Sequence, residues 1–92
     1  MNLETARQLA TEFLDDMQAE SEIELAFNLD ITEEHPLGYV FFYNAKRYWA
    51  TRDFMDSLAG NGPILVRRDN GEVSVLPSNQ SVERSLSELS AC

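Results

Sequence analysis

The spacing of apolar residues predicts an amphipathic helix followed by a strand. Over residues 3–19 apolar side chains recur every three or four positions, which places them on one face of a helix. They are Leu3, Ala6, Leu9, Ala10, Phe13, Leu14 and Met17. Asn2 is placed to cap this helix, and Glu4 lies in its first turn, where the helix dipole favours negative charge. From Ile23 to Ile31 apolar and polar residues alternate, so we expect a strand with one face in the core.

A second strand is predicted at Tyr39–Asn44, after a break at His35-Pro36-Leu37-Gly38. Its pattern differs from that of the first strand, because apolar residues occupy both faces. One face would carry Tyr39, Phe41 and Tyr43, and the other Val40 and Phe42. Such a strand is typical of a sheet that is covered on both sides.

The dipeptide Asn70-Gly71 lies between two apolar runs and predicts a β-hairpin, since both residues tolerate the positive φ of a tight turn. We expect residues 64–68 to pair with residues 72–76, through a two-residue turn or a type I turn with Gly71 in a bulge. Both turns place the same four side chains on one face, which we assign to the core. These are Ile64, Val66, Val73 and Val75.

The remaining segments are shorter. Residues 45–59 are ambiguous, and we interpret them as a short strand through Tyr48-Trp49 followed by a helical turn over Phe54, Met55 and Leu58. Ser81 would cap a last helix with one apolar stripe. No β-α-β alternation occurs, so the predicted fold class is α+β: an N-terminal amphipathic helix packed on an antiparallel meander of about four strands, with a short C-terminal helix. We expect one domain over residues 1–92, with Phe13, Leu25, Phe27, Leu29, Ile64, Val66, Val73 and Val75 buried.

The net charge of −9 is concentrated at the start of the chain. Residues 1–34 contain ten Asp and Glu but only one basic residue, Arg7, while the other 58 residues carry six acidic and six basic residues. This asymmetry suits either a solvated face or a docking face for a basic protein partner. The candidate contact residues on that face are Glu12, Asp15, Asp16, Glu22, Glu24 and Asp30.

Candidate chemistry is sparse. His35 is the only histidine and Cys92 the only cysteine, which argues against Cys-His dyads, zinc quartets and an intrachain disulfide. We therefore expect no catalytic residues, no metal and no cofactor. No stretch approaches the ~20 apolar residues of a membrane span, and the first residues lack a signal segment, so we expect a cytoplasmic protein without membrane contact.

Aromatic residues cluster between Tyr39 and Trp49, near Lys46, Arg47 and Arg52. Aromatic and basic side chains together can stack nucleic-acid bases, but the net negative charge argues against direct nucleic-acid binding. The cluster instead suits the core, a protein-binding patch with Tyr48 and Trp49 as anchors, or a homodimer contact through the aromatic strand 39–44.

One long stretch also resembles a known family. Leu58-Ala59-Gly60-Asn61-Gly62-Pro63-Ile64-Leu65-Val66, followed by Asp69-Asn70-Gly71-Glu72-Val73, is similar to the YrhB-like immunity protein 35 family. Phe41-Phe42-Tyr43-Asn44 and Tyr48-Trp49-Ala50-Thr51-Arg52-Asp53 occupy the places of two further family segments. Arg52 stands where the family usually has glycine, and Arg67 where an acidic residue is common.

The resemblance implies a bacterial immunity protein, which is a non-catalytic domain that neutralises a cognate toxin of a polymorphic toxin system by direct binding. Two alternatives remain open. One is a small stress-related or chaperone-like protein that binds unfolded clients, and the other is an acidic mimic of nucleic acid. A single saturable partner would favour immunity, whereas many weak partners would favour a chaperone.

Overall fold

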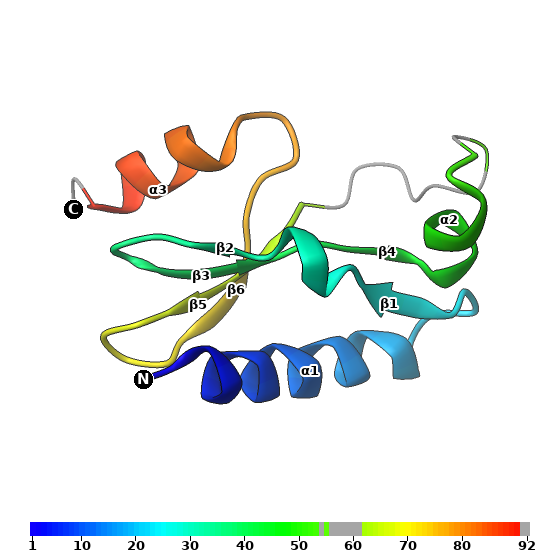
Figure 1. Ribbon diagram of the computed structural model, residues 1–92, viewed down its shortest axis with the longest axis horizontal. Coiled ribbons are helices and arrows are strands. Elements are labelled where there is room, and N and C mark those ends of the chain that lie inside the picture. Colours follow the sequence, from blue (N-terminus) through cyan, green and yellow to red (C-terminus); the bar gives the residue numbers. More distant parts are fainter. Residues whose placement is uncertain (54, 56–61, 91–92) are drawn as a thin grey trace.

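The structure is a computed structural model that describes residues 1–53, 55 and 62–90. Helix α1 (Leu3–Ala19) and helix α3 (Val82–Ser90) lie on opposite sides of a β-layer (Figure 1). Between them the layer contains the strands β1 (Leu25–Phe27), β2 (Glu33–Glu34), β3 (Gly38–Phe41), β4 (Tyr43–Ala45), β5 (Ile64–Arg67) and β6 (Val73–Val75). They form a four-stranded sheet with the order β2-β3-β5-β6 and a two-stranded sheet of β1 and β4. The other elements are the 3-10 turn η1 (Leu29–Ile31) and helix α2 (Lys46–Thr51). The predicted α+β class is confirmed, with more and shorter strands than expected.

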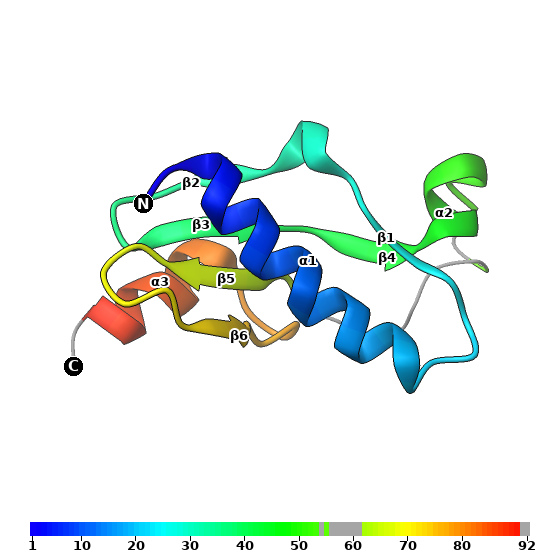
Figure 2. The ribbon, with the colours of Figure 1, turned by 90° about the horizontal axis from the view of Figure 1, so that it is seen from below.

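Helix α1 has the predicted bounds and the predicted cap. The side-chain Oδ1 of Asn2 accepts a hydrogen bond from the backbone N–H of Thr5 at 2.9 Å, which satisfies one free donor of the first turn. Ala6 and Ala10 are completely buried. These small side chains let the helix axis come close to the sheet, so α1 crosses directly over β3 and β5 (Figure 2).

Each face of the sheet has its own apolar core. Beneath α1 the buried side chains are Ala6, Ala10, Leu14, Tyr39, Phe41, Tyr43, Ile64 and Val66. On the other face they are Val40, Leu65, Leu76 and Leu86, the last from α3. Residues of β3 therefore alternate between the two cores, which explains why the sequence of this strand is apolar on both faces.

Strands β1 to β4 form one long antiparallel hairpin with an interruption. Its turn is tight, because His35 and Gly38 exchange two backbone hydrogen bonds of 2.8 and 3.1 Å. Phe27 lies opposite Tyr43, but Glu33 lies opposite Val40. Residues 28–32 thus face only two residues of the other strand, and the three extra residues form η1. The prediction of a continuous strand from Ile23 to Ile31 was wrong in this respect.

The second hairpin, β5–β6, is regular. Val66 pairs with Val73 and Ile64 with Val75, so the predicted face is confirmed. The connection is neither of the two predicted turns. The backbone N–H of Arg67 donates a hydrogen bond to the carbonyl of Glu72, which leaves a four-residue loop. The loop ends at Gly71, which has φ +71°. Two expected core residues are exposed, since Val75 is 44% and Leu29 is 45% accessible. Leu29 belongs to η1, and Val75 ends the edge strand.

The segment after β4 corrects another prediction. Tyr48 and Trp49 lie in helix α2, not in a strand. Phe54 and Leu58, predicted to form a helical turn with Met55, lie outside the described residues. The last helix is confirmed with its cap, because Ser81 Oγ accepts from the N–H of Arg84 at 3.1 Å.

The aromatic strand is internal. Strand β3 is paired on one edge with β2, at Tyr39 and Val40, and on the other with β5, so these two residues offer no free edge to a second copy of the chain. The structure thus removes the basis for a homodimer through this part of the predicted strand 39–44. Within the described residues, no helix has the length and apolar character needed to cross a membrane.

Candidate functional site

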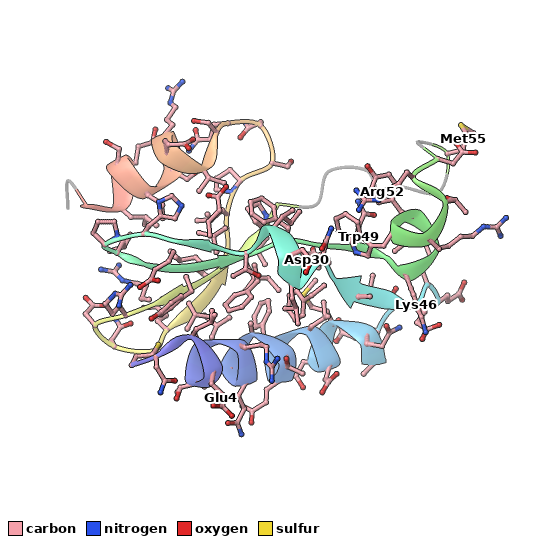
Figure 3. All side chains as sticks on the ribbon, in the orientation of Figure 1. Glu4, Asp30, Lys46, Trp49, Arg52 and Met55 are labelled. Carbon is pink, nitrogen blue, oxygen red and sulfur yellow. The ribbon has the colours of Figure 1, made fainter. Side chains whose placement is uncertain are left out.

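All six predicted acidic contact residues are exposed. Glu12, Asp15 and Asp16 share the face of α1 that points away from the sheet, the side on which Glu4 also lies (Figure 3). Glu22 and Glu24 follow in the loop from α1 to β1, and Asp30 lies in η1. The structure therefore spreads the acidic candidates along one helix, across its C-terminal end and onto the interrupted strand. We call these six residues and Glu4 the acidic side.

The side chains of Gln18 and Glu24 hold the loop from α1 to β1 in place. The side-chain amide of Gln18 donates to the carbonyl of Ile23 at 2.9 Å and accepts from the N–H of Leu25 at 2.6 Å. Glu24 forms an exposed ion pair with Lys46 of α2, with a Nζ–Oε1 distance of 3.3 Å. This pair places a positive charge beside Glu24, which makes Glu24 a poorer contact residue than the carboxylates of α1.

The aromatic pair of α2 has a structural task. Trp49 is half-buried and donates its Nε1–H to the carbonyl of Ala26 at 2.8 Å, which attaches α2 to β1. Tyr48 packs edge-on against it, with ring centroids 5.2 Å apart. The guanidinium of Arg52 lies 5.1 Å from the centre of the Trp49 ring (Figure 3). Because it is covered and hydrogen-bonded, Trp49 is less suited to anchor a partner than the sequence indicated.

Arg52 also occupies an unusual backbone conformation. It ends α2 with φ 57° and ψ 20°, the left-handed region that costs a residue with a Cβ atom about 1–2 kcal/mol. Glycine, which the resembled family usually has at this position, would meet no such cost. Arg67 stands where an acidic residue is common in the resembled family. Its side chain forms an ion pair with Asp69 in the loop after β5, with a Nε–Oδ1 distance of 3.3 Å.

An apolar groove lies between α1 and η1, and the sequence did not predict it. It has a volume of about 400 Å³ and is lined by Leu3, Glu4, Arg7, Leu29, Thr32 and Phe41. Phe41 is only 1% accessible and closes its base, while Leu3 and Leu29 are about half exposed on its walls. We call this site the α1–η1 groove.

Thr32 contributes an uncommon feature to the groove. Its Oγ1 atom is buried and has no hydrogen-bond partner in the part of the chain that the structure describes. A buried hydroxyl without a partner destabilises a protein by about 1–3 kcal/mol. Thr32 immediately follows η1, so this cost arises where the long hairpin is interrupted.

A local signal for η1 was present in the sequence. Asn28 and Asp30 favour turns, and the Oδ1 of Asn28 accepts a hydrogen bond from the N–H of Asp30 at 3.2 Å. The apolar residues Leu29 and Ile31 nevertheless extended the alternating pattern through this segment. The pattern therefore predicted a strand, and Leu29 was assigned to the core instead of to the groove.

Ionisable groups elsewhere are perturbed by ordinary structural contacts. A hydrogen bond to Glu34 raises the pKa of Arg68, whose guanidinium also lies over the ring of Tyr39. A hydrogen bond from Gln80 lowers the pKa of Glu88, and burial raises the pKa of Tyr43 above its ordinary value. Among residues 1–53, 55 and 62–90, no three His, Cys, Asp or Glu side chains gather as metal ligands.

Comparison with known proteins identifies the family. No curated protein and no solved structure matches the chain. The family model described as immunity protein 35 matches residues 4–88. This match runs from the first turn of α1 to near the end of α3 and thus includes both hairpins. The chain belongs to the immunity protein 35 family.

Proposed function

We propose that this protein is an immunity protein that neutralises a cognate toxin by binding it directly, with its acidic side turned toward a basic surface of the toxin. Family membership supports a non-catalytic binding role. The observation that carries the choice of surface is the exposure of the whole acidic side, over a segment that contains the entire net charge of −9.

The physical effect of such a surface falls mainly on the rate of association. Clustered charge of one sign attracts an oppositely charged protein before contact, and this attraction is screened by salt. A toxin that acts on nucleic acid would have a basic surface of this kind, because phosphate binding draws on positive charge. An inhibitor that covers this surface needs no catalytic groups of its own.

Charge reversal on α1 tests this proposal. In the double variant Asp15→Lys/Asp16→Lys, both changes lie on the outward face of the helix, away from the sheet. The candidate toxin is sought in the neighbouring reading frame, and binding to its catalytically inactivated domain is measured at low and high salt. We expect association to slow by about tenfold or more at low salt and the difference to shrink at high salt.

The matched control is Glu72→Lys/Glu83→Lys, which changes the net charge equally. Glu83 belongs to α3, and Glu72 lines a hollow beside α3 on the opposite side of the sheet. This control should slow association much less. The proposed surface is wrong if both doubles have the same effect, and the proposed function is wrong if the unaltered protein fails to bind the toxin domain.

A further inference from the structure

We propose that the α1–η1 groove is an anchor site for one apolar side chain of the basic protein partner. This inference rests on the proposed function and adds the chemistry of the central contact. The partner residue is an aliphatic or aromatic side chain on a basic surface, and it enters between Leu3 and Leu29, above the buried Phe41.

The groove is unfavourable for the stability of the free protein. The interruption at residues 28–32 removes regular strand pairing and leaves two large apolar residues, Leu29 and Ile31, each 45% accessible. It also leaves the buried Oγ1 of Thr32 without a partner among the described residues. A feature that departs from a regular fold in several unfavourable ways, with no visible structural gain, is typical of a functional site.

The groove has the size and the lining expected for an apolar side chain. Its volume of about 400 Å³ lies within the ~300–1,000 Å³ typical of binding pockets, which are mostly apolar and have a few polar groups. Leu3 and Leu29 supply the exposed apolar contact, and Glu4 and Arg7 supply polar groups at the groove. A buried apolar anchor in such a pocket is where binding energy concentrates in protein interfaces.

The charges around the groove are complementary to those of a basic partner. Glu4 and Arg7 line the groove and also line a second depression that continues along α1 to Glu12. The groove is therefore continuous with the acidic side, and exposed Asp30 lies next to Leu29 in η1. An apolar residue flanked by lysines or arginines would place its ring or aliphatic chain in the groove and its basic neighbours near these carboxylates. Arg7 would exclude a lysine directly at the groove entrance.

The matched pair Leu29→Ala and Ile31→Ala tests the anchor. Both residues are in the same helical turn and are equally exposed, but Leu29 lines the α1–η1 groove, whereas Ile31 lines a different hollow beside Trp49 and Pro77. The probe is the same catalytically inactivated domain of the candidate toxin. We expect Leu29→Ala to weaken binding by about tenfold or more through faster dissociation, and Ile31→Ala by less than about twofold.

The outcomes separate this inference from the proposed function. If the toxin domain binds the unaltered protein with the expected charge dependence, but Leu29→Ala and Ile31→Ala affect dissociation equally, the anchor site is wrong and the acidic surface remains. If the unaltered protein does not bind the toxin domain, both proposals are overturned.

Discussion

The two hairpins of this protein are built from similar sequence patterns but differ in regularity. In β5–β6 each residue has one partner, from Ile64 opposite Val75 to Val66 opposite Val73. In the hairpin from β1 to β4, three extra residues leave the ladder between Phe27 and Glu33. The apolar residues of β5–β6 enter the core, apart from exposed Val75. In the hairpin from β1 to β4, Leu29 and Ile31 of the interruption stay exposed.

This difference separates residues that hold the fold from residues that are free to bind. Ile64 and Val66 are fully buried beneath α1 and contribute to stability through apolar burial and close packing. The interruption has no comparable packing, and it forms one wall of the α1–η1 groove. We infer that the regular hairpin serves the fold, as β3 and β4 also do, and that the interruption at residues 28–32 serves recognition.

The largest expected effect is on the regular hairpin. Ile64→Ala removes a side chain with no solvent exposure, so it should lower the free energy of unfolding by about 2–5 kcal/mol. Leu29→Ala removes a half-exposed side chain of similar size and should cost less than about 1 kcal/mol. Urea unfolding of both variants provides the comparison. Equal losses would show that η1 belongs to the core and would contradict the division between the two hairpins.

A smaller effect is expected at the loop of the regular hairpin. Gly71 has φ +71°, and a Cβ atom there would meet only ordinary contacts with Met1 and Leu9 at 3.5 and 3.7 Å. Gly71→Ala should therefore destabilise through backbone conformation alone, by about 1–2 kcal/mol. Glu72→Ala, at the next residue of the chain, is the control and should change stability by less than ~0.5 kcal/mol. If the two variants have equal stability in thermal unfolding, the left-handed turn is not needed.

The smallest expected effect concerns pH and the interrupted hairpin. Burial raises the pKa of Tyr43 in β4 above its ordinary 10.0, so the unfolded chain loses this proton first as the pH rises. The contribution of Tyr43 to stability is therefore complete below pH 10 and declines as the pH rises through the folded-state pKa. Tyr43→Phe should reduce the loss of stability between pH 8 and alkaline pH. An unchanged loss would mean that this tyrosine does not contribute to alkaline unfolding.

Sequence reasoning succeeded where local signals agreed with the tertiary structure. Periodicity and the Asn2 cap predicted α1 with its correct bounds, because one stripe of this helix is buried along most of its length. The two apolar faces of β3 predicted a sheet covered on both sides, and α1 and α3 cover it. Asn70-Gly71 predicted the second hairpin, although the loop contains four residues.

The candidate site was less predictable, because its groove depends on pairing across the hairpin. The alternation from Ile23 to Ile31 is the same whether these residues form one strand or a strand and a turn. Only the register of residues 27 and 33 with Tyr43 and Val40 reveals the three extra residues. Aromatic composition likewise could not show whether Trp49 is free to contact a partner. In the structure its ring N–H donates a hydrogen bond to the carbonyl of Ala26.

The extra residues can be removed without changing the pairing on either side. Phe27 lies opposite Tyr43 and Glu33 opposite Val40. Deletion of Leu29–Ile31 therefore leaves residues 28 and 32 opposite residues 41 and 42. The deletion variant should form a continuous hairpin in this register and remain as stable as the unaltered protein in urea. It should also lose the leucine wall of the groove.

Binding of this deletion variant to the inactivated toxin domain tests the central claim most directly. The claim predicts a folded, stable protein whose affinity for the toxin domain falls by about tenfold or more, matching or exceeding the loss in Leu29→Ala. A folded deletion variant that binds the toxin domain as tightly as the unaltered protein would contradict the assignment of recognition to the interrupted hairpin.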